Sequence, residues 1–239
     1  MSRPLRALLL AAGLGTRLRP LTLHTPKCLV RIGGEPLLGR WLRQLEQLGC
    51  EAVLVNTHYL AEQVEAYLQS WQSSTMGVHT MHEPELLGTA ATLLANQAFF
   101  AGATGLLIHA DNAMAGDLRP FLRAHKDRQP DCLLTMLTFK TGTPSSCGIV
   151  EVDDQQLVQG FYEKMSNPPG NRANGALYAF EPLLLDQLNR MAPPPSDFST
   201  EVIPSLMGRI QTWHTDQAYV DIGTPKALAT AQQLLNQQT

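Results

Sequence analysis

Residues 5–27, LRALLLAAGLGTRLRPLTLHTPK, constrain the fold more than any other stretch of the chain. The apolar run over residues 5–12 is too short to span a membrane and ends at a glycine, so it predicts a strand buried on both faces, as in a parallel sheet. The following turn contains Gly13 and Gly15, and without Cβ atoms its backbone N–H groups can approach an anion. Arg17 and Lys27 add positive charge on either side. This combination predicts a cradle for a polyphosphate.

Two other phosphate-binding loops are excluded by their spacing. The string G-x-x-x-x-G-K-[ST] does not occur, and a Walker loop requires it. The dinucleotide fingerprint G-x-G-x-x-G fails because Leu18 stands at its third glycine. For the two glycines taken alone, an ordinary turn between a strand and a helix is the alternative interpretation.

The composition narrows the class of protein. A chain of 239 residues can bury roughly 70–75% of its unfolded surface, which is enough for a full core. The net charge of −3 argues against a nucleic-acid surface, which would carry a basic excess. No stretch of 18 apolar residues predicts a membrane span. Arg3 and Arg6 precede an apolar run, as in a signal peptide, but this run continues into the glycine turn without a cleavage site. We therefore expect a cytoplasmic protein with no membrane partner.

The four cysteines do not have the spacing of a zinc site or a redox pair. Cys28 follows Lys27 directly, and a neighbouring ammonium can lower the pKa of a thiol. A buried structural thiol is the favoured interpretation for Cys28, because no base is evident nearby.

The alternation of predicted elements indicates the fold class. Strands are predicted at 52–56, 78–82, 106–108 and 132–139, and helices at 36–48, 60–70, 88–98 and 117–127. Such an order predicts an α/β fold with a doubly wound, mainly parallel sheet. Ligands of these sheets lie beyond the carboxyl ends of the strands, so Asp111, after one strand, can meet the glycine turn, after another. From residue 148 the chain predicts strands at 148–152, 157–162, 176–180 and 211–214, with helices at 182–190, 199–207 and from 225.

The string A-A-G-L-G-T-R-L-R-P-L-T, followed after three residues by P-K, resembles the signature of the sugar-1-phosphate nucleotidylyltransferases. These enzymes join an NTP to a sugar 1-phosphate and release an NDP-sugar and pyrophosphate. The resemblance implies a Rossmann-like nucleotidyltransferase fold in a single domain over residues 1–239. It implies a nucleotide-binding half over 1–140 and a sugar-binding half, built from β/α additions, over 141–239. The hexapeptide repeats of the β-helix domain that related enzymes often carry are not expected here.

The resemblance also implies roles for individual residues. Two cations are implied to be catalytic, namely Arg17 and Lys27. Seven positions are implied to bind the nucleotide, namely Ala11, Ala12, Gly13, Gly15, Thr16, Glu83 and Gly88. Gly88 lies in an L-G-T-A segment, where the backbone of related enzymes approaches the nucleobase. Glu83 could accept both N1–H and N2–H₂ of guanine, whereas uracil and thymine offer one donor at that edge. A solvated loop charge is the alternative for Glu83.

Two aspartates are implied to hold Mg²⁺. Asp111 matches the aspartate of the family's N-G-D motif, although His109 and Ala110 replace its first two residues. Asp221 lies in a D-I-G-T-P segment that also resembles the family. Attack of a phosphate oxygen on an NTP brings two anions together, and Mg²⁺ with carboxylate ligands offsets their repulsion. A capping or turn role is the alternative for both aspartates.

Four further residues are implied to bind the sugar phosphate. Gly148 matches a small residue of a G-V-V segment, and Glu163 and Lys164 match an F-x-E-K motif, with Lys164 on the phosphate and Glu163 on a sugar hydroxyl. Asn174 stands where the family has N-A-G, with the glycine shifted by one place. A common surface ion pair is the alternative for Glu163 and Lys164.

A guanylyltransferase for mannose 1-phosphate is the favoured function, with an NTP and a sugar 1-phosphate as partners and a homodimer as an option. The first alternative is a uridylyltransferase for an amino-sugar 1-phosphate such as N-acetylmuramate 1-phosphate. The second is a non-catalytic regulatory paralogue that binds nucleotide-sugars. A dehydrogenase ranks last because the fingerprint glycine is missing.

Overall fold

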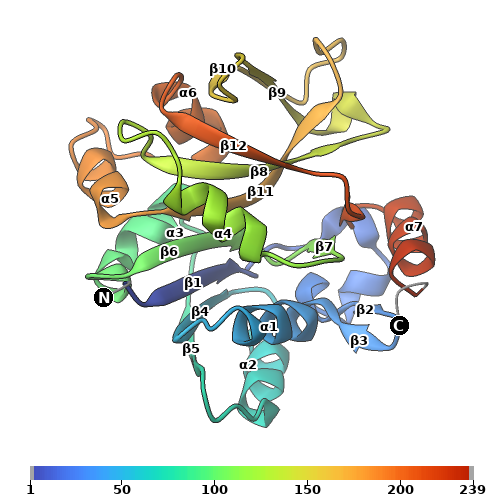
Figure 1. Cartoon of the computed structure of the whole chain (residues 1–239). Coiled ribbons are helices and arrows are strands. Elements are labelled where there is room, and N and C mark those ends of the chain that lie inside the picture. The colour runs from blue at the N-terminus through green and yellow to red at the C-terminus, as the bar shows by residue number, and fades with distance from the viewer. Residues whose placement is uncertain (1–2, 237–239) are drawn as a thin grey trace. The chain divides into compact units, whose positions relative to one another are not determined.

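The computed structural model describes residues 3–236 and contains two compact units, each discontinuous in sequence (Figure 1). The first, which we call the glycine-turn unit, consists of residues 4–86, 108–117 and 217–236. The second, the β-rich unit, consists of residues 3, 87–107 and 118–216. The glycine turn and the C-terminal helix therefore belong to the same unit.

The glycine-turn unit is built on parallel strands. Strand β1 (Leu5–Leu10) pairs in parallel with β4 (Ala52–Thr57), and β4 pairs in parallel with β5 (Gly77–His82). All six residues of β4 are buried, as expected for a strand with helices or loops on both faces. Helices α1 (Leu37–Gln47) and α2 (Ala61–Ser70) follow the predicted pattern. The carboxyl end of β6 (Thr104–His109) lies beside β1, where Ala110 N donates to Leu10 O over 3.1 Å.

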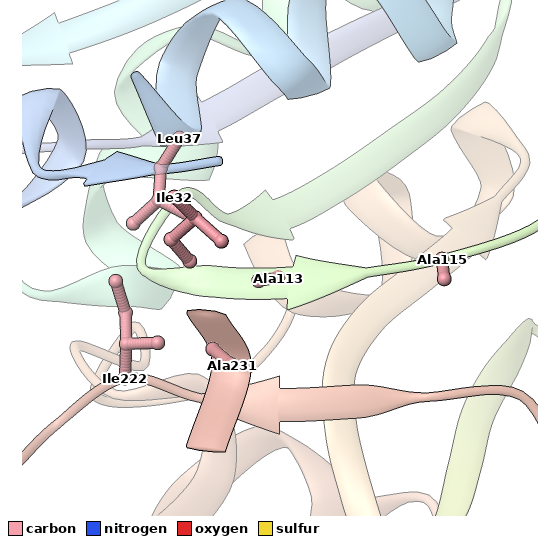
Figure 2. Close-up of a cluster of buried hydrophobic side chains, with 6 residues drawn as sticks. All are labelled: Ile32, Leu37, Ala113, Ala115, Ile222 and Ala231. Carbon is pink, nitrogen blue, oxygen red and sulfur yellow. The ribbon is translucent and has the colours of Figure 1, made fainter. Parts of the chain in front are cut away.

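Short strands complete this unit. Strand β7 (Asn112–Met114) pairs antiparallel with β13 (Tyr219–Asp221), and β2 (Arg31–Ile32) pairs antiparallel with β3 (Glu35–Pro36). Helix α7 (Pro225–Asn236) follows β13. These elements enclose a small apolar core, which Figure 2 shows in close-up. Its buried members are Ile32, Leu37, Ala113, Ala115, Ile222 and Ala231.

The β-rich unit is mainly antiparallel. Strand β8 (Leu134–Lys140) pairs antiparallel with β11 (Arg172–Phe180) and parallel with β12 (Ile210–Thr215). Strand β9 (Gly148–Val152) pairs antiparallel with β10 (Val158–Glu163) and touches β11. Its helices are α3 (Thr89–Ala95), α4 (Arg119–Lys126) and α5 (Pro182–Asn189). The helix predicted over 199–207 is a π-helical turn (Phe198–Val202) followed by the short α6 (Ile203–Ser205).

These elements confirm the predicted α/β class, with parallel strands alternating with helices and mainly antiparallel additions in the second half. No helix within residues 3–236 is long and apolar enough to cross a membrane. Trp41 is buried in α1. The division into halves at residue 140 stays a prediction.

A partly buried polar network holds part of the β-rich unit together. Thr104 Oγ1 donates to Glu181 Oε1 over 2.9 Å, and Arg3 pairs with the same carboxylate. The ring of His125, which is buried, lies with Nε2 3.5 Å from Glu181 Oε1. Burial alone would raise the pKa of Glu181, but its contacts with His125, Thr104 and Arg3 outweigh burial and lower that pKa to about 2. The charged carboxylate is therefore the form that stabilises this network.

We predict that Glu181 makes the free energy of unfolding sensitive to acid. Its folded pKa of about 2 lies below its ordinary value of 4.5, so its contribution is complete above pH 4.5 and is lost as the pH falls towards 2. Glu181→Gln should lower the stability at pH 7 and flatten its fall between pH 5 and 2 in urea titrations. The exposed Asp186→Asn on α5 serves as the control. Parallel acid limbs for wild type and Glu181→Gln would contradict the assignment.

Candidate active site

The glycine-turn unit contains a buried lysine between two carboxylates. Lys27 is only 8% exposed, and its ammonium forms an ion pair with the Asp111 carboxylate. A second pair joins Lys27 Nζ to Asp221 Oδ1 over 3.6 Å. The three residues come from positions far apart in the sequence, and each was among the predicted site residues. We call Lys27, Asp111 and Asp221 the charge cluster.

The pairing of β7 with β13 explains why the two aspartates meet. Asp221 lies directly opposite Asn112, the residue after Asp111. Beyond the strands, Ile222 N donates to Asp111 O over 3.2 Å. The indole N–H of Trp41 fixes this edge further, since it donates to Asn112 O over 2.8 Å. The sequence suggested Asp111 and Asp221 separately, and these backbone contacts bring them together.

The cluster sets the ionisation of Asp111. Burial alone would raise the pKa of Asp111, but the Lys27 ammonium outweighs burial and holds that pKa below its usual range. Asp111 is therefore an anion at neutral pH.

Cys28 does not have the lowered thiol pKa that its neighbour Lys27 suggested. Burial instead raises the pKa of its thiol to about 12. The suggestion of a lowered thiol pKa was wrong, and Cys28 is a buried structural thiol.

The glycine turn has the backbone shape that glycine permits. Gly15 has φ of +62°, a left-handed conformation that side chains disfavour. A Cβ on Gly15 would also lie 2.9 Å from Thr22 Cγ2. The fully buried Thr22 in turn donates its hydroxyl to Gly15 O over 2.7 Å. Thr22 thus fixes the turn, a role that the sequence alone did not indicate. Of the other positions predicted here, Ala11 and Ala12 are buried and Gly13, Thr16 and Arg17 are exposed, and their part in nucleotide binding stays a prediction.

Glu83 is buried rather than solvated, which removes the loop-charge alternative. Its Oε1 accepts from Asn56 Nδ2 over 3.0 Å. The other end of the Asn56 amide, Oδ1, accepts from Ala11 N over 2.7 Å. Because a backbone N–H can only donate, Oδ1 must face Ala11 and Nδ2 must face Glu83. Asn56 therefore links the carboxyl end of β1 to Glu83, and its place at the end of an apolar strand was the available signal.

The β-rich unit brings together three of the predicted sugar-phosphate residues. Gly148 of β9 lies directly opposite Glu163 of β10. A Cβ on Gly148 would lie 2.7 Å from Glu163 Oε2 and 2.5 Å from the Phe161 ring, so only glycine leaves room for both. Lys164 Nζ pairs with Glu163 Oε1 over 2.7 Å. The Lys164 side chain is 62% exposed, so this pair contributes little to stability.

Asn174 lies on β11, which neighbours β9, and its side chain forms hydrogen bonds within β11 itself. Its Nδ2 donates to Tyr178 Oη over 2.6 Å, and its Oδ1 accepts from Ala176 N over 2.9 Å. These bonds span an irregularity in the pairing of β11 with β8, where Ala176 has φ of +50°. Asn174 stabilises this bulge, and a contact with sugar phosphate stays a prediction.

Gly88 lies in the β-rich unit, against the backbone of Ser196. A Cβ on Gly88 would lie 2.5 Å from Ser196 O, and φ at Gly88 is +95°. The same carbonyl accepts from Ala90 N over 2.9 Å at the start of α3. Packing within this unit therefore already requires a glycine here, and the predicted approach to a nucleobase stays a prediction.

Comparison with known proteins places this geometry in a family. The sequence model of the nucleotidyl transferase family matches residues 6–238. The chain belongs to the nucleotidyl transferase family. It is 32% identical to the catalytic subunit beta of mannose-1-phosphate guanylyltransferase from Drosophila melanogaster, and 28% identical to mannose-1-phosphate guanylyltransferase from Mycobacterium tuberculosis. These alignments cover 94% and 92% of this chain, and the chain spans 61% of the length of each relative.

The fold of this nucleotidyl transferase family member also has solved counterparts. The crystal structure of HddC from Yersinia pseudotuberculosis complexed with GMP-PN superimposes with a TM-score of 0.79. It is 21% identical, and the match covers 95% of this chain and 98% of that one. At this identity the likeness establishes the shared fold.

We predict that removing the Asn56 amide destabilises the unit. Asn56→Ala takes hydrogen bonds from a buried carboxylate and a buried backbone N–H, which should lower the free energy of unfolding by about 3 kcal/mol. Asn56→Asp keeps the acceptor for Ala11 but places a second carboxylate beside Glu83, so it should be less stable at pH 8 than at pH 5. Urea denaturation measures both effects, with the exposed Asn189→Ala as the control. Wild-type stability for Asn56→Ala would show that the amide does not support Glu83.

Proposed function

We propose that this chain transfers a nucleotidyl group from an NTP to a sugar 1-phosphate, with GTP and mannose 1-phosphate as the preferred pair. The observation that carries the proposal is the charge cluster beside the glycine turn, in a chain of the nucleotidyl transferase family. A reaction between two phosphate anions needs fixed cations and aligned reactants rather than a protein nucleophile.

The two aspartates of the cluster fit a Mg²⁺ ion. Asp221 Oδ1 is buried, and although Lys27 Nζ lies 3.6 Å away it makes no hydrogen bond within the described residues, so this oxygen can serve as a ligand for Mg²⁺. No group of three or more His, Cys, Asp or Glu able to hold a metal exists in residues 3–236. Mg²⁺ suits this arrangement, because it uses one or two carboxylates and takes its other ligands from phosphates and water. When bound, Mg²⁺ would neutralise charge on the phosphates.

The chain's own residues would then divide the remaining tasks. The glycine turn supplies backbone N–H groups to the NTP phosphates, with Ala11, Ala12 and Thr16 beside it, while Lys27 keeps both aspartates in place. Lys164 would bind the sugar phosphate and Glu163 a sugar hydroxyl. The cytoplasmic location belongs to the proposal as well, supported by four free cysteines.

Two observations support guanine over the other bases. The buried Glu83 carboxylate is held in one orientation by Asn56, and a fixed carboxylate can accept both donors of the guanine edge. The two curated relatives described above are named mannose-1-phosphate guanylyltransferases, and the HddC structure was solved with GMP-PN.

We predict pyrophosphate release from GTP with mannose 1-phosphate in the presence of Mg²⁺. The assay compares GTP, UTP, dTTP, CTP and ATP, each with a panel of sugar 1-phosphates. Release with UTP and an amino-sugar 1-phosphate would instead establish the uridylyltransferase alternative. Silence across the panel, with NDP-sugar binding intact by calorimetry, would refute catalysis and favour the regulatory paralogue.

We predict that Asp221→Asn lowers kcat at least about 100-fold, because the neutral amide binds Mg²⁺ poorly. The Asp221 side chain is 41% exposed, so the variant should fold, and a melting curve will verify this. Asp216→Asn, at a fully exposed carboxylate five residues earlier, is the matched control. Near-wild-type turnover of Asp221→Asn at saturating Mg²⁺ would remove Asp221 from the metal site.

A further inference from the structure

Gly223 of the D-I-G-T-P segment is buried beneath the side chain of Arg17. A Cβ on Gly223 would lie 2.7 Å from Arg17 Nη2, 2.9 Å from Cζ and 3.1 Å from Nη1. Because the central carbon is as close as the two nitrogens, the planar guanidinium lies with its face towards the glycine. Only a residue without a side chain permits this contact.

This close approach brings the Arg17 guanidinium against Gly223. Within residues 3–236, Arg17 makes no hydrogen bond and no ion pair. It follows the glycine turn and is itself exposed, so its long side chain would otherwise be free to move. A guanidinium stacked by its face keeps its N–H donors, which lie in the plane, available to an anion.

The position of Gly223 is fixed relative to the charge cluster. Asp221, two residues earlier, pairs opposite Asn112 on β7, and the N–H of Ile222 bonds to Asp111 O. The buried Ile222 side chain anchors the same loop in the core shown in Figure 2. The surface on which Arg17 rests is therefore a rigid extension of the strand that carries Asp221.

We propose that Gly223 is a positioning residue for the nucleotidyl transfer. It provides the surface on which the Arg17 guanidinium is held beside Asp221, with its donors directed to the phosphates of the NTP. The inference rests on the proposed function and deepens it, because it assigns the glycine of D-I-G-T-P a task that acts through Arg17 alone.

The substitution Gly223→Ala separates this role from a structural one. The backbone of Gly223 is not in the left-handed region, and the atoms that a Cβ would meet belong to the flexible end of Arg17. Alanine should therefore displace the guanidinium without straining the fold, and a glycine replaced at a compatible position tends to raise stability. We expect an unchanged or slightly higher melting temperature together with a kcat lowered roughly 10- to 100-fold, since misplacing a reacting group by about 1 Å has this effect.

A double-mutant cycle tests whether Gly223 acts through Arg17. Wild type, Gly223→Ala, Arg17→Ala and the double variant are compared by pyrophosphate release and by melting curves. Gly142→Ala is the matched control, because Gly142 has no heavy atom within 4 Å of an added Cβ and no left-handed φ. We expect the double variant to match Arg17→Ala within about twofold, since coupled residues are not additive. The KM for sugar 1-phosphate should stay near the wild-type value in Gly223→Ala.

Other outcomes would overturn the inference. Wild-type kcat in Gly223→Ala, or losses that multiply in the double variant, would show that Gly223 does not act through Arg17. A melting temperature lowered by Gly223→Ala but not by Gly142→Ala would indicate a structural role instead. If the wild type releases no pyrophosphate from any NTP, the proposed function is refuted and this inference with it. If the wild type is active and only the results for the Gly223→Ala variants disagree, this inference alone fails.

Discussion

The buried ammonium of Lys27 is the interaction on which the glycine-turn unit depends. A lone charge at 8% exposure would be strongly unfavourable, and the carboxylates of Asp111 and Asp221 compensate it. Removing either aspartate would leave Lys27 paired with a single carboxylate and would change the net charge of the cluster, so the three residues act as one group. The chain around them serves to bring two carboxylates, one from the middle of the sequence and one from near its end, to the same lysine.

That task is performed by short elements rather than by the large sheet. Strands β7 and β13 are three residues each, yet their register places Asp221 next to the residue after Asp111. Packing of Ile222 and Ala231 against Ile32 and Ala113 then fixes the C-terminal segment against the start of the chain. The sheet fixes the positions of β1 and of the end of β6, and the short strands fix the positions of the two aspartates.

This division explains how far sequence reasoning could reach. The strand predicted over 5–12 and observed over 5–10, the helices that alternate with the strands and the choice of Asp111 and Asp221 were predictable, because apolar patterning and residue type are local properties. Strands β7 and β13 were not, since three residues carry no periodic signal. Asn56 and Thr22 were missed for a related reason, because hydrogen bonds to Ala11 and Gly15 depend on contacts distant in sequence. Glu83 was left between two interpretations, and only burial distinguished them.

Arg17 and Lys27, which the sequence analysis grouped together as catalytic cations, have different surroundings in the structure. Lys27 is enclosed and its charge is compensated by two carboxylates, so it has little charge left for a ligand. Arg17 is exposed, has no anionic partner among the described residues and rests by its face on Gly223. A cation held in this way gains most when an anion arrives, because its donors are ordered beforehand and are not already used. Both residues follow the glycine turn, so their difference arises from what distant segments place against each, namely Asp111 and Asp221 against Lys27 and Gly223 against Arg17.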